Sequence, residues 1–300
     1  MSSNQKNTLL VTGASGHLGR RVLELLLETH KGTIIAATRT PEKLADFSQR
    51  GVVVRHADFE DQASLLQAFK GVDRLLLIST DALDVPGRRL NQHRNAIKAA
   101  EQAGVSHVVY TSIINPGPDS PVFVGPDHRG TEEALAATKM GWTALRENIY
   151  TEMLLMSLAQ AFQTGKLINA IGDGKAAYIT REDVARAAAV ALTSSFDGRQ
   201  TLDITGPEAV SQYEMAAIAS KVAGREITYI PVELEALIQT MEANGLPRPL
   251  AEGYASFDAA IAQDKFSAVA TTVEDLTGRK PISVADFLSA HRDVLLPVPS

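Results

Sequence analysis

The amino-acid sequence predicts an α/β fold: a doubly wound parallel sheet in the first half, followed by a smaller, mostly helical C-terminal lobe. Three observations carry this prediction. Short apolar runs alternate with helical patterns up to about residue 146. One run, Leu75–Ile78, is apolar without alternation, as expected of a parallel strand covered on both faces. After residue 146 the regular alternation fades.

The expected strands of the first half are Leu9–Thr12, Thr33–Thr38, Val52–His56, Arg74–Ile78, His107–Thr111 and Trp142–Arg146. Between them we expect a helix from Leu18, a helix opened by Pro41, and helices near Gln62–Phe69 and Asn91–Ala103.

In the second half we expect helices at Tyr150–Gln163, Arg181–Leu192, Gln212–Val222, Leu234–Asn244 and Ala251–Gln263, and strands at Thr201–Ile204 and Ile227–Ile230. Ser283 and Asp286 have capping-box spacing before a last short helix. We divide the chain into residues 1–150, the sheet domain, and 151–300, the lobe. This boundary leaves open that the chain returns to the sheet.

Composition excludes several classes of function. The chain has 300 residues, 45% of them hydrophobic, and a net charge of −6, which does not suggest a nucleic-acid partner. No apolar run reaches the length of a membrane span. The chain has no cysteine, which excludes disulfides and thiolate metal sites and fits a reducing cytoplasm. The seven histidines are scattered, so we expect no metal site.

The first strand leads into the loop Thr12-Gly13-Ala14-Ser15-Gly16-His17-Leu18-Gly19. In this G-x-x-G-x-x-G spacing Gly13 allows a tight turn, Gly16 the close approach of a pyrophosphate, and Gly19 the packing of helix on strand. The backbone N–H groups of four residues would point towards the phosphates: Ser15, Gly16, His17 and Leu18. An ordinary strand-to-helix turn is the alternative, but the position inside a βαβ unit favours a Rossmann dinucleotide site.

The second expected strand ends at Arg39, where NAD-specific sites usually carry an acidic residue. An arginine suits a 2′-phosphate, and Lys43 adds a second positive charge, so we predict NADP(H). The alternative is that both side chains are surface charges that contact only solvent. Asp58 and Phe59 are candidates for the adenine. Ser79 and Thr80, after the fourth strand, are candidates for the riboses.

The usual short-chain reductase dyad, a tyrosine with a lysine four residues later, is absent. The residues four positions after the six tyrosines are isoleucine, leucine, glutamate, alanine, glutamate and aspartate. His128 and Glu132 are four apart on an expected helix, and His128 is a candidate proton donor. The alternative is a histidine that only shapes the pocket. Hydride transfer is the remaining chemistry, and quinones or cationic dyes, which need little enzymatic acid, suit such a site.

Several segments resemble a known family in the same order: "VTGASGHLG", "TRTPEK", "GVVVRHADFED", "QHRNAIKAAEQAGVSHVVYTS", "DHRGTEE", "LRENIYTEM" and "GDGKAAYITREDVARAAA". They resemble the NmrA-like atypical short-chain dehydrogenases/reductases, in particular the quinone- and dye-reducing members. The resemblance implies NADPH at Gly13, Gly16, Gly19, Arg39 and Lys43.

The resemblance also implies an acceptor pocket between the lobes, near Thr111–Pro116, His128 and Asn148–Met153. We count Thr111 with the cofactor residues. The acceptor residues are Ile113, Asn115, Asn148, Ile149, Tyr150 and Met153. Ile149, Tyr150 and Met153 would form an apolar wall or, alternatively, helix core. One departure stands out: Glu147 follows Arg146, where relatives commonly have asparagine.

We therefore predict an NADPH-dependent reductase of a quinone or similar conjugated acceptor. Two alternatives stay open. One is a non-catalytic NADP-binding redox sensor of the NmrA type. The other is a reductase of an imine or ketone, in which His128 or Tyr150 donates a proton. The expected partner is a small molecule, and the sequence leaves a homodimer open.

Overall fold

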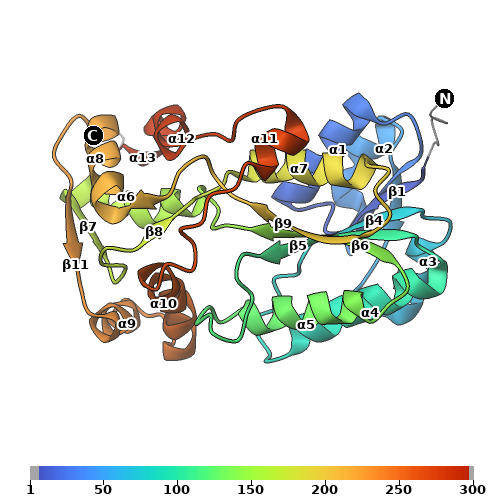
Figure 1. Ribbon diagram of the computed structural model, residues 1–300, viewed down its shortest axis with the longest axis horizontal. Coiled ribbons are helices and arrows are strands. Elements are labelled where there is room, and N and C mark those ends of the chain that lie inside the picture. Colours follow the sequence, from blue (N-terminus) through green and yellow to red (C-terminus); the bar gives the residue numbers. More distant parts are fainter. Residues whose placement is uncertain (1–6, 297–300) are drawn as a thin grey trace. The chain divides into compact units, whose positions relative to one another are not determined.

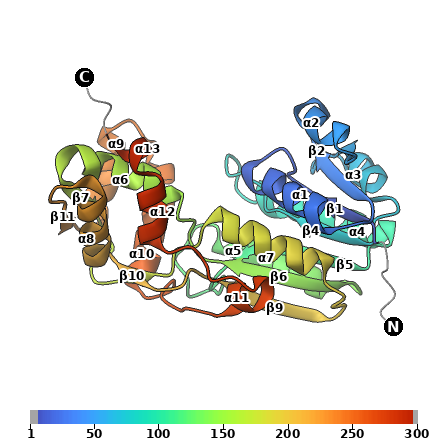
Figure 2. The ribbon, with the colours of Figure 1, turned by 90° about the horizontal axis from the view of Figure 1, so that it is seen from above.

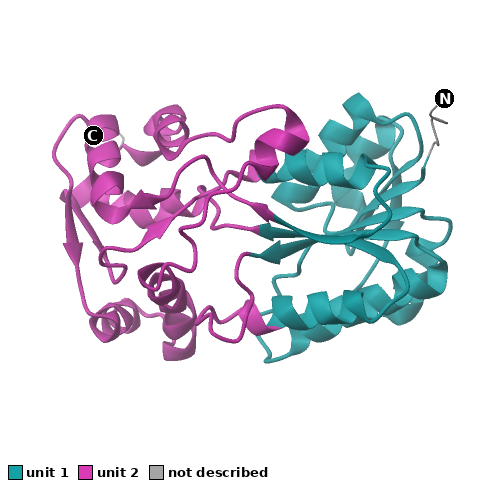
Figure 3. Cartoon of the chain, in the orientation of Figure 1, with its two compact units in different colours: residues 1–113, 127–146, 184–202 teal, residues 114–126, 147–183, 203–300 magenta. Residues whose placement is uncertain are grey.

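The structure is a computed structural model that describes residues 7–296. It contains two compact units (Figure 3). Unit 1 comprises Met1–Ile113, Asp127–Arg146 and Val184–Leu202, and unit 2 comprises Ile114–Pro126, Glu147–Asp183 and Asp203–Ser300. Within residues 7–296 every helix is too short or too polar to span a bilayer. The two units are interleaved along the sequence and do not coincide with a division at residue 150. The assignment of NADP binding to residues 1–150 and of acceptor binding to residues 151–300 stays a prediction.

A seven-stranded sheet has the order β3-β2-β1-β4-β5-β6-β9 (Figure 1). Its strands are β1 (Leu9–Val11), β2 (Ile34–Thr38), β3 (Val53–His56), β4 (Arg74–Leu77), β5 (His107–Ile113), β6 (Gly141–Glu147) and β9 (Arg199–Ile204). In this order, each pair of neighbouring strands from β3 to β5 is parallel: β3 with β2, β2 with β1, β1 with β4, and β4 with β5. The strand order reverses at β1, and the crevice at such a reversal is where open α/β sheets bind their ligands.

Helices cover both faces of this sheet. Figures 1 and 2 show α1 (His17–Thr29) and α7 (Arg181–Thr193) side by side over one face. Helices α4 (Arg88–Ala103) and α5 (Gly125–Ala136) cover the other, and α3 (Gln62–Phe69) packs against α4. The buried core there brings strand residues such as Leu10 and Leu75 together with Phe69 and Ala100. The doubly wound parallel sheet predicted from the sequence is confirmed.

One buried cation joins distant parts of unit 1. The guanidinium of Arg74, on β4, donates to the carbonyl oxygens of Leu192 (2.9 Å), Ala191 (3.2 Å) and Phe196 (2.9 Å). These carbonyls lie at and just beyond the C-terminal end of α7, where the helix dipole is negative. Arg74 therefore caps a helix that follows it by more than a hundred residues.

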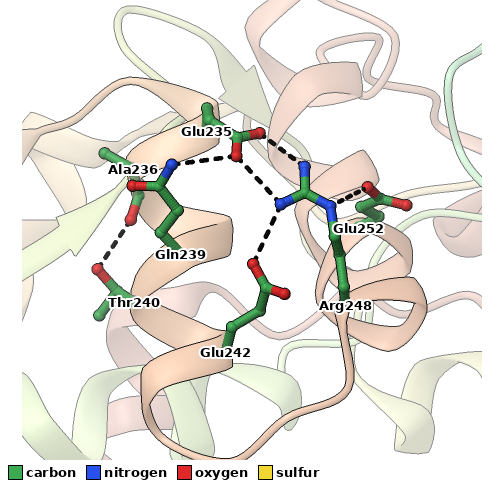
Figure 4. A network of polar contacts seen from close by, with 7 residues as sticks. All are labelled: Glu235, Ala236, Gln239, Thr240, Glu242, Arg248 and Glu252. Carbon is green, nitrogen blue, oxygen red and sulfur yellow. Dashed lines mark hydrogen bonds and ion pairs between the residues drawn. The ribbon is translucent and has the colours of Figure 1, made fainter.

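Unit 2 contains two small sheets and several helices. Strand β7 (Lys166–Asn169) pairs in parallel with β11 (Thr228–Pro231), and β8 (Lys175–Ala176) pairs antiparallel with β10 (Val210–Ser211). The helices are α6 (Met153–Thr164), α8 (Gln212–Ala223), α9 (Leu234–Ala243), α10 (Arg248–Ala262), α11 (Thr272–Thr277), α12 (Val284–Ala290) and α13 (Arg292–Leu295). Figure 4 shows how Arg248, at the start of α10, binds three carboxylates: Glu235 and Glu242 on α9, and Glu252 one turn along α10.

The structure corrects several expected elements. The helix expected from Tyr150 begins at Met153, because Tyr150 forms a parallel bridge with Ile179 instead. The segment after Pro41 is a 3-10 turn, Pro41–Leu44, followed by the short helix α2 (Ala45–Gln49). The strand expected at Thr201–Ile204 is β9 of the main sheet. The two-residue strands β8 and β10 were not expected, because elements this short leave no periodic signal.

Candidate cofactor and active site

The loop between β1 and α1 has the geometry that a bound pyrophosphate requires. Gly13 has a φ of +58°, in the left-handed region that favours glycine. A Cβ atom at Gly19 would lie 2.5 Å from the carbonyl oxygen of Gly13, so only glycine lets α1 pack this closely on the loop. A Cβ atom at Gly16 would lie 3.3 Å from the same oxygen. The structure therefore has the tight turn and close packing that the glycine spacing predicts.

The start of α1 presents backbone donors to the loop. Gly16 is the N-cap and provides no capping side chain, and the first helical bond runs from the N–H of Arg20 to the carbonyl of Gly16 (3.0 Å). The N–H groups of His17 and Leu18 therefore have no acceptor within the helix. His17 is exposed, whereas the Leu18 side chain is buried. Unpaired amides at the positive end of a helix are suited to an anionic ligand, so the loop fits the phosphates of NADP(H).

Hydroxyl groups tie the glycine loop to the end of β2. The Ser15 and Thr38 hydroxyl oxygens are 2.9 Å apart, and Thr38 also accepts a hydrogen bond from the N–H of Thr40 (3.2 Å). Arg39 lies between these threonines in sequence and is exposed. The hydroxyl chain therefore holds the backbone on both sides of Arg39 close to the loop. The side chain itself stays free to meet either a 2′-phosphate or solvent.

Arg20 fixes the segment that carries Lys43. Its guanidinium donates to the carbonyl oxygen of Lys43 (3.0 Å) and to a carboxylate oxygen of Asp46 (2.5 Å). The same guanidinium lies over the Phe47 ring, 4.8 Å from the ring centre. These contacts attach the turn after Pro41 to α1 and hold the backbone of Lys43 beside the glycine-loop helix. The Lys43 side chain is exposed.

Asp58 and Phe59 follow β3, as predicted, but much of their bonding capacity serves the fold. One carboxylate oxygen of Asp58 accepts from the N–H of Glu60 (2.9 Å), which closes a turn. Phe59 packs against the main core cluster, and its carbonyl accepts a hydrogen bond from Asn95 (3.0 Å). Their contact with adenine stays a prediction.

The segment after β4 is held by side chains from three other elements. Thr12 accepts from the N–H of Ile78 (3.0 Å), and Thr111 accepts from the N–H of Ser79 (2.8 Å). Two residues of α4 hold the next residue, Thr80: His93 Nε2 accepts from its N–H (3.0 Å), and Arg89 donates to its carbonyl (2.7 Å). The predicted cofactor residues Ser79, Thr80 and Thr111 are therefore brought together.

His128 is buried inside unit 1 with both ring nitrogens occupied. Arg89 can only donate, so His128 Nε2 accepts from its guanidinium (2.9 Å). The ring hydrogen then lies on Nδ1, which donates to the hydroxyl of Tyr110 (2.8 Å). Burial, followed by the nearby charge of Arg89, lowers the pKa of His128 well below its usual value of 6.5. This neutral histidine has no free proton to donate, so the geometry favours the alternative in which it shapes and supports the site.

His128 and Glu132 do not contact each other as their spacing suggested. Glu132 instead accepts two hydrogen bonds from Arg146, at 3.1 and 2.7 Å, and one from the hydroxyl of Ser112 (2.7 Å). This two-pronged ion pair joins α5 to the neighbouring strands β5 and β6. Glu132 is therefore a residue of the sheet-to-helix packing.

The expected acceptor residues fall in both units. Ile113 ends β5 in unit 1, whereas Asn115, Asn148, Ile149 and Met153 belong to unit 2. Asn115 has a left-handed φ of +49°, and its side chain donates to the carbonyl of Lys265. Asn148 is buried and donates to the carbonyl of Phe266 (2.9 Å), so it holds the backbone in place. Met153 is 41% exposed, which does not fit the helix-core alternative.

Glu147 and Tyr150 form the most perturbed ionisable pair of unit 2. The Tyr150 hydroxyl donates to Glu147 Oε2 over 2.5 Å, and Glu147 Oε1 is buried without a hydrogen-bond partner. Burial raises the pKa of Glu147 to about 8, although the bond from Tyr150 lowers it. Burial and Glu147 together raise the pKa of Tyr150 well above its usual value of 10. Glu147 therefore holds a proton near neutral pH.

Sequence reasoning identified Tyr150 but missed the roles of Arg89, His93 and Tyr110, and gave Glu147 no task. Arg89 and His93 are four residues apart, and α4 (Arg88–Ala103) carries both on one face, but the helix expected from Asn91 left Arg89 outside it. Their partners, Thr80 and His128, are far away in the sequence, and only the folded chain brings them together.

Comparison with known proteins agrees with this geometry. A family described as NAD(P)H-binding matches residues 13–195. Quinone oxidoreductase 2 of Escherichia coli (strain K12) is 34% identical over 94% of this chain and 97% of its own length. The solved structure of the NADPH-dependent quinone oxidoreductase of Escherichia coli, complexed with NADPH, gives a TM-score of 0.89 at 34% identity and covers 94% of this chain and 99% of that one.

Two further relatives point in the same direction. The Citrobacter sp. triphenylmethane reductase complexed with NADP(H) gives a TM-score of 0.88 at 31% identity, over 94% of this chain and 99% of that one. An NmrA-like family domain-containing oxidoreductase of Aspergillus flavus is 31% identical over 95% of this chain and 96% of its own length. The chain therefore belongs to the NAD(P)H-binding family, among its NmrA-like members, and is an NAD(P)H-dependent oxidoreductase.

Proposed function

We propose that the protein reduces a quinone or a similar conjugated acceptor with NADPH. The observation that carries this proposal is the likeness to a quinone oxidoreductase along 94% of the chain, joined to a glycine loop whose geometry suits phosphates. Bound NADPH supplies a hydride. The chain needs no Tyr-x-x-x-Lys dyad for this chemistry, because a conjugated acceptor delocalises the charge that it gains.

The residues of unit 1 have separate tasks in this proposal. The amides of His17 and Leu18 bind the pyrophosphate. Arg39 and Lys43 bind the 2′-phosphate and favour NADPH over NADH. Ser79 and Thr80, held by Thr111, His93 and Arg89, place the riboses. His128 supports this arrangement through Arg89 and does not donate a proton.

Steady-state oxidation of NADPH against a panel of acceptors tests the proposal. The panel contains a benzoquinone, a naphthoquinone, a triphenylmethane dye, an imine and a ketone, each also run with NADH. We expect turnover of the quinones and the dye, with a higher kcat/KM for NADPH than for NADH. Turnover of the ketone or imine alone would replace the proposed acceptor. Tight NADPH binding without turnover of any acceptor would favour the redox sensor.

Two further proposals concern the setting of the activity. The absence of cysteine fits a reducing compartment, which supports a cytoplasmic location. Sedimentation of the purified protein tests the homodimer that the sequence leaves open. The proposed partner in the reaction itself is a small molecule.

A further inference from the structure

Glu147 and Tyr150 link a buried carboxyl group to the phenol of a partly buried tyrosine. Glu147, the last residue of β6, is 6% exposed, whereas Tyr150 is only partly buried. The phenol oxygen lies 2.5 Å from Glu147 Oε2, within range for direct proton transfer. The other carboxyl oxygen of Glu147 is buried without a partner. The pair therefore has a buried carboxyl group that can store a proton and a neighbouring phenol on a residue that is only partly buried.

The backbone around Tyr150 is held at almost every peptide. Asn148 donates from its N–H to Ile204 (2.9 Å), and Ile149 accepts from the N–H of Ile179 (3.0 Å). The N–H of Thr151 donates back to Ile179 (2.9 Å). Such a segment fixes the phenol relative to the carboxyl group before any ligand arrives, which is what efficient proton transfer needs.

Two other charged groups act on Tyr150. The Arg181 guanidinium lies over the phenol ring, 5.0 Å from its centre, and favours the phenolate. Glu152 opposes ionisation of Tyr150, and one of its carboxyl oxygens accepts from the N–H of Arg181 (2.9 Å). Arg181 therefore stabilises the charge that Tyr150 carries for a moment after losing its proton.

We propose that Tyr150 donates a proton to the acceptor and that Glu147 replaces that proton, so that the pair serves neutral acceptors reduced at a carbonyl, quinone or imine. This inference rests on the proposed function and extends it to the acceptor class.

The step balances in atoms and charge. A neutral quinone that gains one hydride becomes an anion with its charge on oxygen. The phenol hydrogen of Tyr150 first turns away from Glu147 Oε2 and passes to the quinone oxygen. The carboxyl group of Glu147 then rotates to point its own proton at the phenolate and transfers it there. The result is a neutral hydroquinone and an ionised Glu147, which regains a proton from water after product leaves. A triphenylmethane dye is already a cation, so a hydride alone makes it neutral and no proton is needed.

This contrast provides the test. We measure kcat for a benzoquinone and for a triphenylmethane dye in the wild type, Tyr150→Phe and Glu147→Gln. If the pair donates the proton, the ratio of quinone kcat to dye kcat falls at least about tenfold in both variants. Tyr213→Phe, at an exposed tyrosine, is the matched control and keeps the wild-type ratio. An unchanged ratio in both variants overturns the relay and leaves the proposed function intact.

Two measurements on the wild type do not depend on how the variants fold. Quinone kcat falls as pH rises past about 8, the pKa of Glu147, while dye kcat does not follow this fall. In the protein without cofactor, infrared spectroscopy should show the carbonyl band of a protonated carboxyl group, and this band should disappear over the same pH range. Parallel pH profiles for both acceptors, or no such band, overturn the relay. Failure of the wild type to reduce either acceptor overturns the proposed function, and the relay with it.

Discussion

Replacing Glu147 with glutamine will remove a pH-dependent cost to the stability of the fold. Burial raises the pKa of Glu147 from 4.5 to about 8. Between these values the folded chain keeps a proton that the unfolded chain has released. The free energy of unfolding of the wild type therefore falls as pH rises through this range, at about 1.4 kcal/mol per pH unit.

The size of the effect follows from the 3.5 pH units between the two values, which correspond to roughly 5 kcal/mol. Glutamine does not ionise, so Glu147→Gln lacks this slope. A buried amide without a partner costs about 1 to 3 kcal/mol, but that cost does not change with pH. The unfolding free energy of the variant minus that of the wild type should therefore rise steadily with pH and level off above about pH 8.

Urea unfolding followed by circular dichroism, repeated from about pH 5 to about pH 9, measures this difference. Glu28→Gln, at an exposed glutamate, controls for the loss of one charge. Tyr150→Phe removes the hydrogen bond that lowers the pKa of Glu147. The unfolding free energy of Tyr150→Phe should therefore stop falling with pH at a higher pH than that of the wild type. Stability curves of the wild type and Glu147→Gln that stay parallel over the whole range would refute the reasoning.

Three further changes test unit 1. Gly19→Ala places a methyl group 2.5 Å from the carbonyl oxygen of Gly13. It should weaken NADPH binding at least about tenfold in a fluorescence titration. Gly125→Ala, where the added methyl group meets open space, should not weaken it. Arg39→Glu should lower the NADPH-to-NADH ratio of kcat/KM at least about tenfold, and an unchanged ratio would mean that Arg39 only contacts solvent. Arg89→Met leaves the carbonyl of Thr80 and Nε2 of His128 unpaired. Urea unfolding should therefore show a free energy of unfolding lower by roughly 2 to 5 kcal/mol. The exposed control Arg94→Met should change it little.

The parts of the fold that follow from local periodicity could be predicted. The apolar run at Leu75–Ile78 became the buried strand β4, and Ser283 caps α12 by accepting from the N–H of Asp286, as the spacing predicted. The glycine spacing predicted the turn at Gly13 and the close packing at Gly19, because both depend on a missing side chain and not on distant partners.

The parts that depend on distant partners could not be predicted. The spacing of His128 and Glu132 suggested a helical pair, but Arg89 and Arg146 are better partners for these two side chains in the folded chain. Likewise, the apolar pattern after Tyr150 is helical, yet pairing with Ile179 delays the helix to Met153. A one-dimensional pattern does not contain these competing contacts.

The cap that Arg74 places on α7 has a consequence for synthesis on the ribosome. A nascent chain of about 150 residues already holds β1 to β6, but β6 then forms an unpaired edge and the guanidinium of Arg74 lacks its carbonyl acceptors on and after α7. An unpaired edge promotes aggregation. Unit 1 therefore closes only after residue 202 has left the exit tunnel, and until then that edge of the sheet stays unpaired.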